Sequence, residues 1–266
     1  MFGNHRLLRV VVVCFGATGF LFASMIVASA QSSRERSAAS YLSRGSEWQE
    51  QGDFDRAIAD FGIAITFNPR FARAYYLRGR AHLSKGDVNA ALVDFNRAIE
   101  LDPRLVLAYN DRGFALIEIG EDAAAITDFN RAIELKPRYA RAYYNRAFVR
   151  IRQCDHKGAI ADFDRAIEND KKYAAAYNNR GYARVALGDQ AGALSDFDRA
   201  IKFDPRYAEA YANRGMLMLR MGRKADADAD FARAVGLKPE MKASLEQSIK
   251  ILQTKNPGLT TGRCNK

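Results

Sequence analysis

The chain is poor in the residues from which most catalytic and metal sites are built. Its 266 residues include three histidines, three cysteines and one tryptophan. It contains no glycine-rich phosphate loop, no Gly-x-Ser-x-Gly sequence and no pair of histidines spaced for one helix face. His82 and His156 lie far apart in the sequence, so they do not form a local pair. We therefore expect no enzymatic activity, no cofactor and no metal site.

The chain also lacks runs of charge of one sign. Lysine and arginine exceed aspartate and glutamate enough to give a net charge of +10, but they are dispersed along the sequence. A nucleic-acid-binding surface would need a continuous basic stripe with aromatic residues for base stacking. We expect no nucleic-acid partner, whereas the positive balance suits acidic partners or an anionic membrane surface.

One long apolar run is present, and it lies at the N-terminus. Arg6 and Arg9 precede this run, and Ala28-Ser29-Ala30 follows it. A basic head, an apolar middle and small residues at the end are typical of a secretory signal peptide, so we expect residues 1–30 to be cleaved after Ala30. The product would be exported, to the periplasm or beyond the cell. The alternative is an uncleaved membrane anchor over residues 10–30, about 21 residues and long enough to span a bilayer.

Most of the remaining sequence repeats with a period of 34 residues. A tyrosine is followed three residues later by arginine and four residues later by glycine, with alanine replacing the glycine in one copy. The tyrosines are Tyr41, Tyr75, Tyr109, Tyr143, Tyr177 and Tyr211. A fixed period of this length is typical of helix-turn-helix repeats. Six units without gaps follow: 38–71, 72–105, 106–139, 140–173, 174–207 and 208–241.

The fifth unit shows why each unit should contain two helices. Key side chains within 177–184 and within 193–200 recur at helical spacing, so each segment predicts one helix face. Gly188 between them can adopt the left-handed conformation that ends a helix, and Asp189 can cap the next one. Pro205 has no amide hydrogen, so it should end the second helix.

Small and aromatic residues recur beside each other in the second helix of every unit. The alanines are Ala57, Ala91, Ala125, Ala159, Ala193 and Ala227, and the phenylalanines are Phe61, Phe95, Phe129, Phe163, Phe197 and Phe231. With the tyrosine, glycine and proline, this pattern resembles the tetratricopeptide repeat family. The resemblance implies an all-α, right-handed superhelical solenoid of six antiparallel helix pairs. It also implies that the first helices line a concave groove that binds a peptide or protein segment.

The segments that flank the repeats are short. Residues 31–37 predict a polar linker, and residues 256–266 predict a flexible tail. Between the last repeat and the tail, Leu245, Ile249 and Leu252 form one apolar stripe. A helix over 242–255 should therefore cap the last repeat, as the end of a solenoid requires.

The arginine of each repeat has two possible roles. The six residues, Arg44, Arg78, Arg112, Arg146, Arg180 and Arg214, could form a ladder that binds phosphate or carboxylate groups. However, an aspartate follows each of them after 16 residues. We favour one ion pair per repeat, joining the first helix to the second, because an unpaired and partly buried arginine would be costly.

The fourth repeat departs from the pattern at Ala147, Cys154 and Lys171. These residues replace a close-packing glycine, a turn glycine and a terminating proline. Although Cys154 lies near His156, we interpret it as a turn residue, since catalytic partners usually come from distant positions. In an oxidising compartment it could pair with Cys264.

Candidate binding residues are those of the first helices that vary between repeats. They are Tyr76, Arg80, Asn110, Asp111, Phe114, Tyr144, Asn145, Phe148, Asn178, Asn179, Tyr182 and Asn213. Asn145, Asn179 and Asn213 are equivalent in three successive repeats, so their amides could bind the backbone of an extended segment. Alternatively, asparagine is only a polar filler at these positions.

The sequence therefore favours a non-enzymatic scaffold for protein interaction, whose partner is a protein or peptide that the sequence does not identify. One alternative is a structural assembly subunit that associates through its convex face or its ends. A less favoured alternative is a recognition partner of a separate enzyme.

Overall fold

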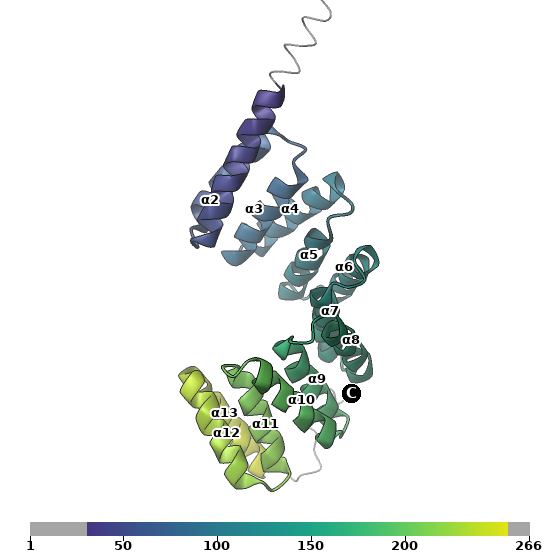
Figure 1. The fold of residues 1–266 in the computed structure, drawn as a ribbon, viewed down its shortest axis with the longest axis vertical. Helices are drawn as coiled ribbons and strands as arrows, with labels where there is room; N and C mark the ends of the chain where they lie inside the picture. Colours follow the sequence, from purple (N-terminus) through teal and green to yellow (C-terminus); the bar gives the residue numbers. More distant parts are fainter. Residues whose placement is uncertain (1–30, 255–266) are drawn as a thin grey trace, which may run out of the picture. The chain divides into compact units, whose positions relative to one another are not determined.

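The computed structural model describes residues 31–254, and these residues are all helical apart from short connections. No strand occurs in this range. Figure 1 shows that consecutive helices lie beside each other and are joined by short turns. None of the helices in the described range is both long and apolar enough to cross a membrane. The proposed signal peptide and the proposed tail lie outside the described residues.

Each of the six repeats contributes two helices. The first is a helix over residues 31–50. It is followed by α2 (Phe54–Phe67), α3 (Ala72–Ser84), α4 (Val88–Leu101), α5 (Val106–Glu118), α6 (Asp122–Leu135), α7 (Ala140–Arg152), α8 (His156–Asn169), α9 (Ala174–Ala186), α10 (Gln190–Phe203), α11 (Ala208–Arg220) and α12 (Lys224–Leu237). A short 3₁₀ turn, η1 (Pro239–Met241), leads into α13 (Lys242–Thr254).

Helix pairs within repeats are the strongest packing units, as in α3 with α4 and α7 with α8. The chain divides into two compact parts between Ala108 and Tyr109. Within each part the second helix of one repeat packs against the first helix of the next. The all-α fold of paired helices is thus confirmed.

Close packing inside each pair explains the recurring glycine, alanine and phenylalanine. The alanines and phenylalanines of the second helices are almost fully buried. A Cβ atom added to the glycine of the first helix, for example Gly181, would lie only 2.6–2.9 Å from the phenylalanine ring of the same repeat. Glycine therefore lets the ring lie directly on the helix backbone. In the fourth repeat, Ala147 and Phe163 are both fully buried, so the ring packs against a methyl group there.

The turns between paired helices have the backbone that the sequence predicted. Five glycines of these turns have φ between 76° and 84°. Cys154, at the equivalent position of the fourth repeat, has φ 64°, so it occupies the left-handed region without being glycine. Asp189 accepts a hydrogen bond from the backbone N–H of Gly192 at 2.9 Å, and Asp53, Asp87 and Asp155 cap their helices in the same way. Cys154 is also disulfide-bonded.

One expectation about a chain segment differs from the structure. Residues 31–37 are helical and continue directly into the first helix of repeat 1, so they do not form a linker. Loss of proline at Lys171 does not extend α8, which ends at Asn169, equivalent to the last residues of the other second helices. The reason is local, because Asp170 accepts a hydrogen bond from the backbone N–H of Lys172 at 3.0 Å. The same side-chain turn occurs at Asp204.

The capping helix is confirmed. Leu245 on α13 is buried in a cluster with Phe231 and Met218, and Ile249 packs against this cluster. Helix α13 thus covers apolar side chains of α11 and α12 that would otherwise face solvent.

Candidate interaction site on the first helices

The arginine and aspartate of each repeat form a bidentate ion pair. Nε and Nη2 of the arginine donate to the two carboxylate oxygens at 2.6–2.9 Å. The pairs are Arg44–Asp60, Arg78–Asp94, Arg112–Asp128, Arg146–Asp162, Arg180–Asp196 and Arg214–Asp230. All six aspartates are buried. The ion-pair interpretation is confirmed, and these arginines are not a ladder open to phosphate.

In the last three repeats the same arginine also reaches the preceding repeat. Its Nη1 atom donates at 2.5–2.6 Å to a residue 16 positions earlier, on the second helix of the repeat before. These contacts are Arg146–Asn130, Arg180–Asp164 and Arg214–Asp198. We call Arg146, Arg180 and Arg214 the bridging arginines. The pKa of Arg214 lies above its ordinary value, first because of its hydrogen bond to Asp230 and then because of Asp198.

A column of exposed aromatic residues runs over three successive first helices. Phe114 on α5, Phe148 on α7 and Tyr182 on α9 are equivalent in the repeat and are 43%, 42% and 45% exposed. We call them the aromatic column. Met216 occupies the next equivalent position and is half-buried. Large apolar side chains exposed in register on neighbouring helices are a typical feature of an interaction surface.

The asparagines beside the aromatic column are hydrogen-bonded to one another between helices. Nδ2 of Asn145 donates to Oδ1 of Asn110 at 3.0 Å, and Nδ2 of Asn213 donates to Oδ1 of Asn178 at 2.9 Å. Each bond joins a residue to one 35 positions earlier, on the preceding first helix. We call this set of contacts the amide relay.

The amide relay also includes Tyr144 and contacts within helices. Asn179 donates to the hydroxyl of Tyr144 at 3.0 Å, again 35 positions earlier. Nδ2 of Asn178 donates to Oδ1 of Asn179 at 3.0 Å, and Nδ2 of Asn110 donates to Oδ1 of Asp111 at 2.8 Å. Burial raises the pKa of the Tyr144 phenol above its ordinary value, and the hydrogen bond from Asn179 partly opposes this rise.

These contacts change the role of the asparagines. Asn110 and Asn178 are 1% and 3% exposed, so they are part of the packed interior. Asn145, Asn179 and Asn213 each donate one amide hydrogen bond to the preceding first helix. The amides therefore hold the first helices together. That their remaining amide hydrogens bind a peptide stays a prediction.

Two predicted site residues, Tyr76 and Arg80, lie in the other compact part. Tyr76 is 5% exposed and its ring lies 6.1 Å from that of Phe95, so it belongs to the core of repeat 2. Arg80 is exposed, with its guanidinium 5.9 Å from the Tyr76 ring. The aromatic column does not continue at these positions.

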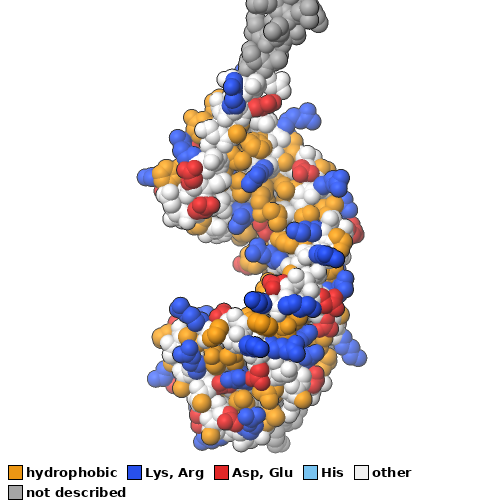
Figure 2. All heavy atoms as spheres, in the orientation of Figure 1, with side chains coloured by type: hydrophobic (Ala, Val, Ile, Leu, Met, Phe, Trp, Pro, Cys, Tyr) orange, Lys and Arg blue, Asp and Glu red, His pale blue; other side chains and the backbone are white. Residues whose placement is uncertain are grey.

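Charge on the displayed surface is mixed. In Figure 2, lysine and arginine side chains are scattered among acidic and hydrophobic ones and do not join into one stripe.

Three site residues were missed at the level of sequence: Asn130, Asp164 and Asp198, the partners of the bridging arginines. Their signal was present, because they too recur every 34 residues and lie 16 residues before an arginine.

Comparison with protein families gives matches along most of the repeat region. Families described as tetratricopeptide repeat match residues 42–105 and 208–241, and one described as TPR repeat matches 115–153 and 181–222. Together these matches cover more than half of the chain. The chain belongs to the tetratricopeptide repeat family, whose members are generally non-enzymatic and mediate protein–protein interactions.

Solved structures support the same fold. The structure of pilF from Pseudomonas aeruginosa is 15% identical in sequence, with a TM-score of 0.72. The match covers 82% of this chain and 99% of that one. YrrB, described as a TPR protein with an unusual peptide-binding site, is 23% identical with a TM-score of 0.55 and coverage of 71% and 97%. MamA is 25% identical with a TM-score of 0.54 and coverage of 62% and 96%. A search of curated proteins finds no match.

Proposed function

We propose that the chain is an exported scaffold that binds a segment of a partner protein on the first helices of repeats 3 to 6. The observation that carries this proposal is the aromatic column of Phe114, Phe148 and Tyr182. Leaving three large apolar side chains more than 40% exposed in register has a cost in water that a bound partner would remove. Aromatic residues are also the side chains that most often dominate binding energy at interfaces.

The amide relay defines how a partner would be held. Because one donor of each of these amides is already used inside the protein, the partner would gain most from side-chain contact with the aromatic column. The relay would also keep the first helices fixed, which lowers the entropy lost on binding. YrrB, a protein of the same fold, contains a peptide-binding site, which is compatible with an extended segment as the ligand.

Export rests on residues 1–30. The basic head, the apolar run and Ala28-Ser29-Ala30 support cleavage that leaves Gln31 as the first residue, in the periplasm or outside the cell. Mass spectrometry of the N-terminus would yield a peptide beginning at Gln31. Recovery of an intact Met1 from the membrane fraction would instead establish the anchored form.

A second candidate function is structural assembly through the second helices. Its support is Val93 on α4, which is 68% exposed, and Ile63 on α2, which is 37% exposed. Binding through these residues would not involve the aromatic column.

The experiment that tests the main proposal replaces Phe114, Phe148 and Tyr182 together by serine. A partner is first identified by pull-down from periplasmic extract with mass spectrometry, and its affinity is then measured by calorimetry. We expect the triple variant to bind at least about tenfold more weakly, because it loses its aromatic anchors. Because each side chain is also partly buried, the triple variant should lose some stability, so affinities are compared at a temperature at which circular dichroism shows both proteins to be folded.

The matched control is Val93→Ser, which removes an exposed apolar side chain from a second helix. The control should leave the affinity unchanged. If Val93→Ser weakens binding and the triple variant does not, the partner binds the second helices and the assembly candidate replaces the first.

A further inference from the structure

The first helix of repeat 1 exposes a face that the equivalent helices of later repeats bury. Ser40 is exposed on this helix. Its equivalents in the later repeats are alanines with 0% exposure: Ala74, Ala108, Ala142, Ala176 and Ala210. In the later repeats this face packs against the second helix of the preceding repeat, as α9 packs against α8.

Arg44 shows what is missing from the uncovered face. Its Nε and Nη2 atoms bind Asp60, but Nη1 has no hydrogen-bond partner among residues 31–254. The equivalent Nη1 atoms of the bridging arginines bind an asparagine or aspartate of the preceding second helix. The side chain of Arg44 is 53% exposed, whereas that of Arg180 is 11% exposed.

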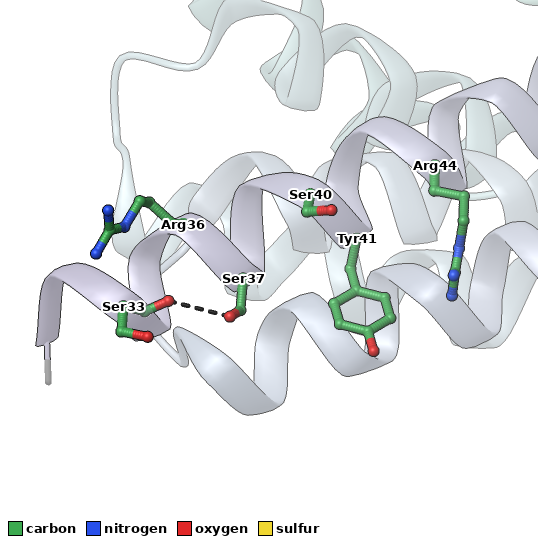
Figure 3. Close-up of a pocket in the computed structure, with 6 residues that line it drawn as sticks. All are labelled: Ser33, Arg36, Ser37, Ser40, Tyr41 and Arg44. Carbon is green, nitrogen blue, oxygen red and sulfur yellow. Dashed lines mark hydrogen bonds between the residues drawn. The ribbon is translucent and has the colours of Figure 1, made fainter.

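The exposed face has the shape and charge to receive another helix. Ser33, Arg36, Ser37, Ser40, Tyr41 and Arg44 line a shallow hollow of about 420 Å³. Figure 3 shows these six residues along one side of the helix, and we call them the serine–arginine stripe. Three serines leave room for close approach, and the stripe contains two arginines but no acidic residue. It is therefore complementary to a carboxylate.

The segment that precedes the stripe in this chain does not provide that carboxylate. Residues 1–30 contain neither aspartate nor glutamate. Glu47, three residues beyond Arg44 on the same helix, acts on Arg44 through its charge, but no hydrogen bond occupies Nη1 of Arg44 within residues 31–254.

We propose that the serine–arginine stripe is a second docking surface, which binds an amphipathic helix of a partner protein that presents an aspartate or glutamate to Arg44. The surface is separate from the aromatic column, and the proposal does not depend on the proposed function. The chain itself supplies the precedent, because α8 packs on α9 and places Asp164 at 2.5 Å from Nη1 of Arg180.

A second copy of this chain is a poor occupant. The last second helix, α12, has Ala232 at the position equivalent to Asp164, so it offers no carboxylate there. In addition, α13 packs against the end of the last repeat. The occupant is therefore a different protein with an acidic amphipathic helix.

The test uses a synthetic peptide of the α8 sequence, residues 156–169, held helical by a side-chain lactam bridge on its outer face. The purified full chain is titrated with this peptide. Binding is followed by the fluorescence of Trp48, the only tryptophan, which lies one turn beyond Arg44 on the same helix. We expect saturable binding that becomes at least tenfold weaker when the peptide carries Asp164→Ala.

Two protein variants locate the site. Ser40→Glu should weaken binding at least tenfold, because the new carboxylate lies one helical turn from Arg44 and would occupy it. Ser43→Glu makes the same change at an exposed residue off the stripe, so binding should be unchanged. Absence of saturable binding, or equal affinity for the two variants, would reduce the stripe to a polar end of the solenoid. Self-association of the chain that Ser40→Glu abolishes, seen by light scattering, would overturn the proposal in favour of a second copy.

Discussion

The first two repeats and the last three use the same arginine in different ways. Arg44 and Arg78 each hold the aspartate of their own repeat, and their Nη1 atoms have no partner among the described residues. Arg146, Arg180 and Arg214 hold an aspartate of their own repeat and a polar residue of the repeat before. In the first region the side chain joins two helices, and in the second it joins three.

This difference teaches how a repeat protein can vary its cohesion without changing its backbone. The position 16 residues before the arginine is occupied by Gly62 for Arg78, by Asn130 for Arg146 and by Asp164 for Arg180. Asn130 and Asp164 accept a hydrogen bond from Nη1, whereas Gly62 has no side chain to do so. Stability in such arrays is approximately a sum of repeat and interface contributions. One side chain per interface therefore adjusts the coupling between neighbouring repeats.

The largest effect is expected from breaking a bridge. Arg180→Leu would leave Asp196, 1% exposed, with Arg184 as its remaining guanidinium partner, and Asp164 without one. Removing one member of a buried ion pair typically costs about 3–5 kcal/mol, and we expect about 3 kcal/mol here because Arg184 remains. Urea unfolding followed by circular dichroism measures the loss.

Arg44→Leu is the matched variant in the first region. Arg44 has one aspartate partner, and its own side chain is 53% exposed. The loss of unfolding free energy should therefore be clearly smaller than for Arg180→Leu. Equal losses for Arg180→Leu and Arg44→Leu would show that the bridge adds nothing to the pair within the repeat.

A bridge can also be added where it is absent. A Cβ atom at Gly62 would lie 3.8 Å from Nη1 of Arg78, so Gly62→Asp can reach it. We expect a gain of about 1–2 kcal/mol from the new hydrogen bond together with the better helix propensity. Thermal and urea unfolding of the variant give the value.

Gly62→Ala separates the two contributions, since it improves helix propensity by about 0.5–1 kcal/mol without forming a bridge. Aspartate has a helix propensity up to about 0.7 kcal/mol less favourable than that of alanine, so Gly62→Asp should exceed Gly62→Ala by only about 0.5 kcal/mol. If Gly62→Asp is less stable than Gly62→Ala by about 0.7 kcal/mol, the third contact of the arginine has no energetic value in this region.

The smallest effect is expected at Cys154, whose backbone conformation lowers the stability of the fourth repeat. Cys154 has a left-handed backbone that favours glycine, so Cys154→Gly should stabilise the reduced protein by about 1 kcal/mol. The measurement is thermal unfolding in a reducing buffer, with Cys264→Ser as the control for thiol effects.

Without reductant the same change removes the disulfide of Cys154, which we propose to involve Cys264. Equal mobility on reducing and non-reducing gels, with two titratable thiols in the mature protein, would contradict that pairing. An unchanged or lower melting point in the reducing buffer would contradict the strain at Cys154.

Much of the fold could be predicted because the residues that determine it recur in every repeat. The 34-residue period, the glycine beside a phenylalanine and the arginine 16 residues before an aspartate each refer to neighbours within one helix pair. The amide relay could not be predicted in this way. Its partners, such as Asn145 and Asn110, are 35 residues apart at non-equivalent positions, and their contact depends on how adjacent first helices are turned toward each other.

The helical start at residues 31–37 was missed for a different reason. Serine and arginine there have no apolar periodicity, so composition favoured a linker. In the structure Ala38 is 1% exposed and fixes the end of this segment to the first repeat. Helical hydrogen bonds then extend backward from a packed residue, which a local reading of polarity does not detect.

Because the bridging arginines bind residues of the preceding repeat, they favour folding of the later repeats in order from the N-terminus. During synthesis the N-terminal part of a chain is available first, and domains generally fold in that order. When Arg180 leaves the ribosome, its partner Asp164 has already emerged with the rest of its repeat, whereas Asp196, 16 residues later in the chain, is still inside the exit tunnel. Each later repeat can therefore be guided onto finished structure before its own second helix exists.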